Sequence, residues 1–327
     1  MRFALMIEAQ QSLSYADQLA LVRRAEAAGF EAFFRSDHYA AFPGPSDGPT
    51  TDAWTVLAGL ARETERITLG VLVSPVTFRH PGSFVKVVTT VDEMSGGRIE
   101  VGVGAGWNAH DHRPLGLSFP EIGERADLME DQLAVLHGLW GEADGWSYAG
   151  HQVSVEGGFL RPRPVVVPGR PLGATGQARP RLIVGGEGSP RGFRIAARWA
   201  DEFNLTSSPP DRAREQFAAL GAACRAIGRD PATITRSAMI GTMIGRDDAE
   251  VAARRSALLG ALGVADAAGS AWYEARTARW ILGTPDDARA MIRRFADAGV
   301  ERIMLQDFLP LDLEMVDLMA DELIGRV

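Results

Sequence analysis

The residues best suited to acid–base chemistry lie in one short run, Arg35-Ser36-Asp37-His38-Tyr39. An imidazole can donate or accept a proton near neutral pH, and a neighbouring carboxylate can orient it. The spacing alone leaves two interpretations open. The run is either a turn with a hydrogen-bonded, partly buried histidine, or a site at which His38, oriented by neighbours that include Asp37, acts on a substrate.

Two glycine-rich runs are further candidates. Gly102, Gly104 and Gly106 alternate along an apolar stretch, a spacing that a strand needs where a ligand or a tightly packed neighbour approaches the backbone. The run Gly185-Gly186-Glu187-Gly188 precedes a predicted helix, where backbone N–H groups can bind an anion such as phosphate. Both runs are short, so neither identifies a ligand by itself.

Several other chemistries lack support in the sequence. His110 and His112 flank Asp111, but no H-E-x-x-H motif or evident third ligand accompanies them, so we expect no metal site. There is no G-x-S-x-G elbow and no phosphate-binding P-loop. Cys224 is the single cysteine, which excludes an internal disulfide, and Lys86 is the single lysine, which argues against a lysine Schiff base.

The composition is that of a globular protein. Of the 327 residues, 46% are hydrophobic and 23% charged, enough to bury a large core. The formal net charge of −8 argues against nucleic acid as a partner. No apolar stretch approaches a membrane span, and the N-terminus does not resemble a signal peptide. We therefore expect a cytoplasmic protein that binds a small-molecule substrate, with a homodimer as a possible assembly.

The elements that must position these residues alternate between short β-type runs and amphipathic helices. Ser14 is a suitable helix N-cap, Gly29 a left-handed helix stop, and the run 284–287 a second helix start with a capping hydroxyl and proline. The predicted strands cover residues 3–7, 31–34, 67–73, 99–103, 182–184, 202–205, 236–244 and 302–305.

Eight such βα units without a break in composition predict one closed (β/α)8 TIM barrel spanning residues 1–327. An open doubly wound sheet would show a similar alternation. The strand count, and the absence of an early G-x-G-x-x-G after the first strand, argue against it. In barrels of this kind the loops after the strands form the active face, so the polar runs should meet there. This expected position, opposite the glycines of strand four, favours a site at His38 over a simple turn.

Two segments should shape the pocket of this barrel. Residues 141–181, between predicted strands four and five, are rich in Gly and Pro and form either a functional flap or a packing insertion. Residues 261–282 carry Trp272, Tyr273 and Trp280, which could line a pocket or pack in the core.

Taken together, these runs resemble the luciferase-like monooxygenase superfamily, and within it the coenzyme F420-dependent oxidoreductases. The resemblance extends over nearly the whole chain. Its most specific part runs from Phe78 to Asn108 and includes Thr90-Val91-Asp92-Glu93-Met94-Ser95-Gly96-Gly97-Arg98 and Gly104-Ala105-Gly106-Trp107-Asn108.

The resemblance implies a deazaflavin across the barrel mouth and hydride transfer to or from a small organic substrate, with the Asp-His pair in contact with both. It also implies a non-prolyl cis peptide near Leu72-Val73 that supports the ring, and cofactor contacts at Ser74, Gly106, Asn108, Gly185, Gly186 and Gly188. His80 and Trp107 would face the substrate.

One departure from the family pattern concerns the substrate. The sugar-phosphate dehydrogenases of this branch carry a glutamate where this chain has Trp107, and their lysine contacts have no counterpart here. The sequence thus predicts an F420-dependent oxidoreductase that is not a sugar-phosphate dehydrogenase, in which His38 works without a second acid. The alternatives are a monooxygenase using reduced flavin mononucleotide (FMN) and oxygen, and an F420-binding protein without turnover.

Overall fold

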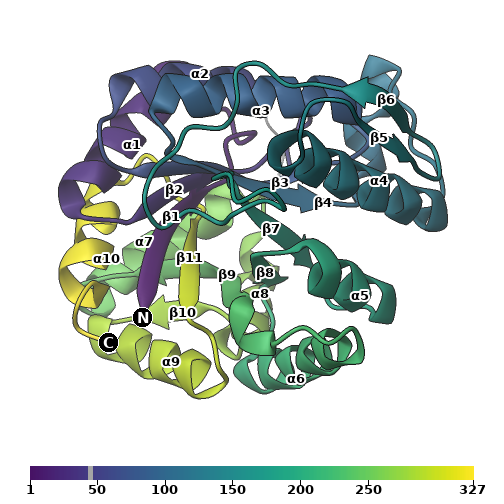
Figure 1. Cartoon of the computed structure of the whole chain (residues 1–327). Coiled ribbons are helices and arrows are strands. Elements are labelled where there is room, and N and C mark those ends of the chain that lie inside the picture. Colours follow the sequence, from purple (N-terminus) through teal and green to yellow (C-terminus); the bar gives the residue numbers. More distant parts are fainter. Residues whose placement is uncertain (43–46) are drawn as a thin grey trace.

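Eight parallel strands close into a barrel in the computed structural model, which describes residues 1–42 and 47–327 (Figure 1). The strands pair in chain order around the barrel, and its last strand pairs with its first. They are β1 (Arg2–Ile7), β2 (Ala32–Arg35), β3 (Thr68–Pro75), β4 (Ile99–Gly104), β7 (Arg181–Gly186), β8 (Glu202–Thr206), β9 (Thr235–Ile244) and β11 (Arg302–Asp307). The predicted (β/α)8 barrel is confirmed.

Helices surround the barrel, and their ends follow the predicted capping signals. Ser14 and Thr284 form capping boxes with Asp17 and Asp287, and Gly29 ends the first helix with a φ of 90°. The surrounding helices are α1 (Tyr15–Ala28), α2 (Ala53–Glu63), α3 (Pro81–Ser95), α4 (Ile122–Gly141), α5 (Pro190–Trp199), α6 (Pro210–Ala226), α9 (Pro285–Asp297) and α10 (Leu313–Leu323). Among the residues that the structure describes, no helix is long and apolar enough to cross a membrane.

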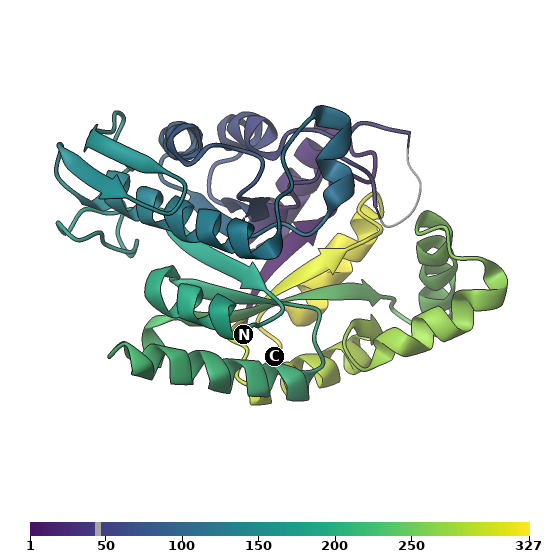
Figure 2. The same ribbon diagram turned by 90° about the vertical axis from the view of Figure 1, so that its right-hand side faces the viewer.

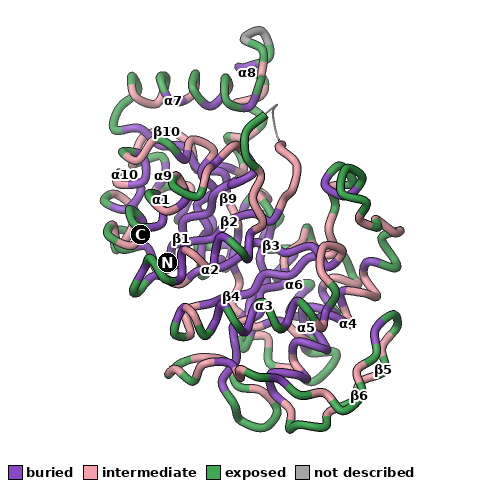
Figure 3. The backbone as a smooth tube through the Cα atoms, turned by 90° about the horizontal axis from the view of Figure 1, so that it is seen from above, coloured by how far each residue is buried: buried purple, intermediate pink, exposed green. Residues whose placement is uncertain are grey.

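Buried residues concentrate on the barrel strands (Figure 3). The core has two layers because successive residues of a strand face opposite sides. One set of side chains packs between the strands and the helices, and includes Leu5, Phe33 and Val101. A smaller set fills the barrel interior and is formed by Ala4, Met6, Ala32, Phe34, Leu72, Ile183 and Met304. The barrel is therefore a packed core below a mouth that can hold a ligand.

An ion network closes the interior near the beginning of the strands. The guanidinium of Arg302, only 1% exposed, lies 2.7 Å from a carboxylate oxygen of Glu100 and 3.1 Å from one of Glu202. Burial raises the pKa of Glu202, whereas Arg302 favours its charged form.

Arg302→Ala should therefore lower the free energy of unfolding by about 3–5 kcal/mol, because the carboxylates of Glu31, Glu100 and Glu202 lose their buried partner. Urea unfolding would measure this. Arg23→Ala removes an exposed ion pair with Glu63 and should cost less than about 1 kcal/mol. Equal costs for the two variants would contradict a structural role for the buried network.

Residues 141–181 contain a hairpin of β5 (Trp146–Ala149) and β6 (Ser154–Gly158), which lies near the start of the barrel strands (Figure 2). Arg170 fixes the segment to α3 through a bidentate pair with Asp92. The segment follows a helix rather than a strand, so it lies at the end of the barrel opposite the active face. The expectation that it shapes the pocket is wrong; it is a packing insertion.

A second insertion follows β9 and lies at the other end of the barrel (Figure 2). It comprises α7 (Asp248–Ala261), α8 (Asp266–Thr277) and β10 (Ile281–Gly283), and β10 extends the sheet beside the end of β9. Short 3-10 turns occur at Ala109–Asp111, Arg113–Leu115 and Pro231–Thr233. Because the second insertion follows a strand, it is the one that reaches the active face.

Candidate active site

A cavity of about 630 Å³ opens at the carboxyl ends of the strands, within the usual range for small-molecule sites. It brings together residues from the ends of the strands and from the insertion after β9. Its lining includes Glu8, Ser36, His38, Phe42, Leu72, Val73, Gly104, Gly106, Trp107, Asn108, Asp111, Gly185, Gly186, Glu187, Asn204, Thr206, Met239, Arg276, Arg279, Trp280 and Gln306.

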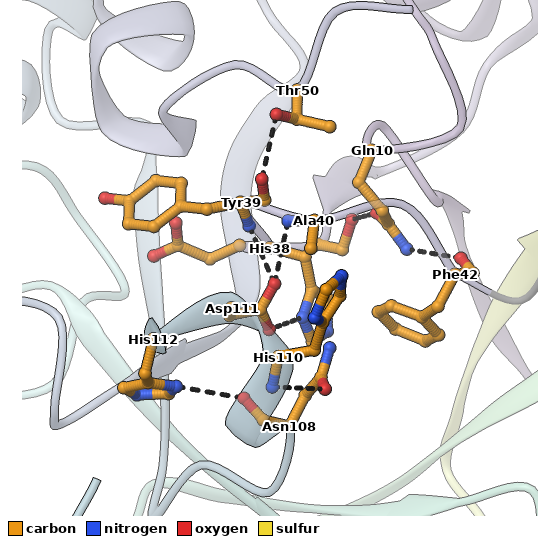
Figure 4. A network of polar contacts seen from close by, with 12 residues as sticks. Gln10, His38, Tyr39, Ala40, Phe42, Thr50, Asn108, His110, Asp111 and His112 are labelled. Atoms are coloured by element: carbon orange, nitrogen blue, oxygen red, sulfur yellow. Dashed lines mark hydrogen bonds and ion pairs between the residues drawn. The ribbon is translucent and has the colours of Figure 1, made fainter. Parts of the chain in front are cut away.

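His38 is held by Asp111 rather than by its neighbour Asp37 (Figure 4). Nδ1 of His38 lies 2.7 Å from an oxygen of Asp111, and the other oxygen accepts hydrogen bonds from the backbone N–H groups of Tyr39 and Ala40. The His38 side chain is 14% exposed and the Asp111 side chain 1%. The sequence-based expectation that Asp37 orients the histidine is therefore corrected.

The contact with Asp111 indicates that Nδ1 of His38 carries a proton. Burial opposes ionisation of Asp111, but the hydrogen bond from His38 and the two backbone amides outweigh it, so the pKa of Asp111 lies below its usual value. An ionised Asp111 accepts the Nδ1 proton. In the neutral form of an imidazole held in this way, Nε2 is an acceptor that can take a proton from a ligand and later return it.

Asp37 belongs to a buried network beneath this pair. Arg79 makes a bidentate contact with Asp37, at 2.6 and 3.2 Å, and also contacts Asp52 and the hydroxyl of Tyr39. The Asp37 side chain is fully buried and does not line the cavity. Its position suits a residue that holds the loop carrying His38, and not one that touches substrate.

The same network predicts a pH dependence. Burial opposes ionisation of Asp52, but Arg79 and the backbone N–H of Thr55 lower its pKa to about 2. A carboxyl whose pKa is lower folded than unfolded stabilises the fold above its ordinary pKa near 3.9, and this contribution is lost as the pH falls toward 2. Asp52→Asn should flatten the fall in unfolding free energy between pH 4 and 2, measured by urea titrations. The exposed Asp321→Asn should keep the wild-type slope, and equal slopes in both variants would contradict the assignment.

The peptide bond between Leu72 and Val73 is cis, at the position expected from the family resemblance. The side chain of Val73 occupies the space that three glycines leave open. A Cβ atom at Gly104 would lie 2.6 Å from Val73, and one at Gly185 would lie 2.7 Å from it. A Cβ atom at Gly102 would lie 2.9 Å from the Val73 side chain. Tight packing therefore explains the glycines of β4, and Val73 forms a wall of the cavity.

Two expected cofactor contacts face away from the cavity. The Ser74 hydroxyl is buried and accepts a hydrogen bond from the indole N–H of Trp54. Gly188 has a φ of 83° and packs near Phe193. Gly186 differs from both, because a Cβ atom there would meet no atom within 4 Å. Its missing side chain leaves room along the cavity wall.

Trp107 and Phe42 form an aromatic wall beside His38. Their rings meet edge to face at 5.0 Å, and the Trp107 ring lies 5.8 Å from that of His38. Trp107 is 66% exposed. His80 does not join them: it is exposed, caps α3 by accepting from the backbone N–H of Gly82, and does not line the cavity. Its expected contact with the substrate is not supported.

His112 connects the loops after β3 and β4. Its Nδ1 donates to the backbone oxygen of Asn108, and its Nε2 lies 2.7 Å from the hydroxyl of Thr77 (Figure 4 shows the Asn108 contact). The exposed His110 lies on the same turn but contributes only its backbone N–H to Asn108. Within residues 1–42 and 47–327 no cluster of side chains suits a metal ion.

Two arginines of the second insertion line the outer part of the cavity. The Arg276 guanidinium lies 3.5 Å from the ring centroid of Trp272 and 5.4 Å from that of Trp280. Burial, together with the charge of Arg279, lowers the pKa of Arg276. The Nε atoms of both arginines are buried without a hydrogen-bond partner in the described part of the chain. The pair is thus suited to an anion, and the predicted contribution of this segment to the pocket is confirmed for Trp280.

Sequence reasoning missed two acidic residues of the site. Asp111 is 73 positions from its partner His38 in the chain, and only its place between two histidines drew attention. Glu8 directly follows β1, and its place at a strand end was the available signal. Both lie where the barrel topology brings loop residues together.

Comparisons with known proteins identify the family of the chain. The sequence profile of the family described as luciferase-like monooxygenase matches residues 1–305. The chain belongs to the luciferase-like monooxygenase family. A solved F420-dependent secondary alcohol dehydrogenase, in complex with an F420–acetone adduct, superposes with a TM-score of 0.81 at 18% identity, covering 99% of this chain and 98% of the other. A long-chain alkane monooxygenase superposes with a TM-score of 0.79 at 16% identity, covering 100% and 91%. At these identities the likeness concerns the fold.

Curated relatives of this family member are more similar in sequence but match only in part. An F420-dependent glucose-6-phosphate dehydrogenase of Nakamurella multipartita is 34% identical over 187 residues, which are 56% of this chain and 50% of the relative. An F420-dependent hydroxymycolic acid dehydrogenase of Mycobacterium tuberculosis is 26% identical over 71% of this chain and 60% of the relative. The chain thus spans about half the length of the first of these relatives.

Proposed function

We propose that the protein is a coenzyme F420-dependent oxidoreductase that transfers a hydride between the deazaflavin and a small organic substrate. The observation that carries the proposal is the Asp111–His38 pair, which presents a free imidazole nitrogen to a cavity of cofactor size. The named F420-dependent relatives support the same choice of cofactor.

The residues present fit a flat tricyclic cofactor with an anionic tail. Val73 and Leu72 give the cavity an apolar wall at the cis peptide, and the open space at Gly186 accommodates a group next to the backbone. Arg276 and Arg279 lack an acidic partner among the described residues, which suits them to the phosphate or carboxylates of the tail or to an anionic group of the substrate. Leu72, Val73, Gly106, Asn108, Gly185 and Gly186 would hold the cofactor.

Bound F420 supplies or accepts the hydride at its central ring, and the protein handles the proton. In the reduction of a substrate, protonated His38 would give its Nε2 proton to the atom that gains electron density, which is the oxygen or nitrogen of a carbonyl or imine and the α-carbon of an enone. His38 is then neutral and recovers a proton from solvent. In oxidation Nε2 accepts the proton instead. Asp111 keeps the imidazole in the orientation that both directions need, while Trp107 and Phe42 limit access of water.

The site departs from one suited to a sugar phosphate. The family resemblance implies that Trp107, which is exposed, stands where the sugar-phosphate dehydrogenases of this branch carry an acid. Lys86 lies on α3, with its ammonium on the backbone oxygen of Arg161. We therefore propose that the substrate is an alcohol, carbonyl, imine or enone other than a sugar phosphate.

Fluorescence titration with F420 and with FMN tests the cofactor. We expect quenching of F420 fluorescence at micromolar concentrations and much weaker binding of FMN. Tight binding of FMN without binding of F420 would favour the monooxygenase alternative. Binding of F420 without turnover of any alcohol, imine or enone in a screen would favour the non-catalytic alternative.

A further inference from the structure

A second carboxyl group lies in the floor of the cavity. Glu8 directly follows β1, is 5% exposed and lines the cavity together with His38. One carboxylate oxygen accepts the side-chain N–H of Gln10 at 2.8 Å, and the other accepts that of Gln306 at the end of β11. Gln10 is itself held by the hydroxyl of Ser36. Its side-chain N–H also donates to the backbone oxygen of Phe42 (Figure 4).

Glu8 differs from the other buried carboxylates near the site. Asp37 pairs with Arg79 and Asp111 with His38. Glu8 has no cation within ion-pair distance in the described part of the chain, and two neutral amides are its side-chain partners. An ionised carboxylate has about four acceptor sites, and a buried one is costly without charged or hydrogen-bonding partners. Its remaining acceptor sites therefore suit a donor that enters the cavity.

We propose that Glu8 is a substrate-binding residue whose carboxylate accepts a hydrogen bond from a hydroxyl or protonated amino group of the substrate. This inference rests on the proposed function, because it places that donor beside the carbon that exchanges a hydride. The sequence-based expectation that His38 works without a second acid stays a prediction, because Glu8 accepts a hydrogen bond in this proposal and transfers no proton.

The consequence is that the cavity should prefer ligands that carry a hydrogen-bond donor, because the acceptor Glu8 lies on the cavity floor. Gln10 and Gln306 hold the carboxylate from two sides, so its orientation does not depend on the substrate. A hydrogen bond to a charged group contributes tenfold or more to affinity when it replaces an unsatisfied contact. A ligand of the same size that carries only a hydrogen-bond acceptor cannot form this hydrogen bond. Its lone pair would face the carboxylate of Glu8 and be repelled by it.

Three five-membered-ring probes of similar size test the proposal on the F420-loaded protein by calorimetry. Cyclopentylamine is a cation at pH 7, cyclopentanol is a neutral donor, and tetrahydrofuran is an acceptor only. We expect cyclopentylamine and then cyclopentanol to bind more tightly than tetrahydrofuran, by about tenfold or more for the amine. Absence of this order, including absence of binding by any probe, would overturn the proposal.

Two variants show whether Glu8 causes the order. Glu8→Gln should reduce the preference for the amine over tetrahydrofuran about tenfold. Glu187→Gln removes an exposed carboxylate of the same cavity and should leave the preference unchanged. An equal effect of Glu187→Gln would show that the preference comes from the overall negative charge of the cavity. It would overturn the proposal of a direct hydrogen bond to Glu8.

The affinity for F420, measured on each variant, separates this proposal from the proposed function. Glu8→Gln should bind F420 within about twofold of wild type. A large loss of F420 affinity with an unchanged probe preference would show that Glu8 holds the cofactor, which also overturns the inference. Failure of the wild type to bind F420 would instead contradict the proposed function, and the probe order would then be measured on the protein without cofactor.

Discussion

His38→Ala should lower the rate of hydride transfer about 10²–10⁴-fold while leaving the affinity for F420 nearly unchanged. The reason is that the variant removes the group that donates or accepts the proton, and general acid–base catalysis contributes an effect of this size. Single turnovers with an alcohol or imine identified by screening, followed by the absorbance of the deazaflavin, would measure the rate.

His110→Ala is the matched control for this variant. His110 is exposed on the turn next to Asp111, and its side chain does not line the cavity. The control should react at close to the wild-type rate. A wild-type rate in His38→Ala, or an equal loss in both variants, would contradict the role of His38.

Asp111→Asn should have the second largest effect, a fall of about 10²-fold or more in the same rate. Its remaining amide oxygen can still accept from the backbone N–H groups of Tyr39 and Ala40, so the loop should keep its shape. The new NH₂ group would face Nδ1 of His38 and favour the tautomer with the proton on Nε2. That tautomer cannot accept a proton from the substrate, a defect that is severe in other enzymes with a carboxylate–histidine pair.

The pH profile distinguishes this orienting role from a structural one. Loss of the ionised partner disfavours the cationic form of the imidazole, so it should shift the profile for substrate oxidation toward lower pH values, and the rate should depend on the tautomer. The double variant with His38→Ala should be no slower than His38→Ala alone, because residues that act as a unit are not additive. Additive losses and an unchanged profile would show that Asp111 only supports the fold.

The barrel could be predicted from the sequence because local signals and the global fold agree. Eight β-type runs alternate with helices, and cap residues such as Ser14 and Thr284 mark helix starts that the structure confirms. The family resemblance also placed the cis peptide at Leu72–Val73 correctly. The roles of the individual site residues stay predictions.

Topology explains the error on the first insertion. Residues 141–181 are unusual in composition, which drew attention to them, but they follow α4 and so lie at the far end of the barrel from the strand ends. The plainer insertion after β9 reaches the active face because it follows a strand. The element that precedes an insertion therefore indicates its face better than its composition does.

Contacts between side chains of different loops could not be predicted from the sequence. Asp37 is adjacent to His38 in the chain, yet successive residues at a strand end face opposite sides, and Arg79 takes the Asp37 carboxylate. The partner of His38 comes from the turn after β4. Such contacts depend on how two loops pack, and local patterns carry no information about that.

A crystal structure of the protein with F420 tests the central claim most directly. We predict that the deazaflavin lies against Leu72 and Val73 with its central ring facing Nε2 of His38, and that Asp111 remains on Nδ1. A ring bound outside this cavity, or a His38 side chain turned away from it, would contradict the account.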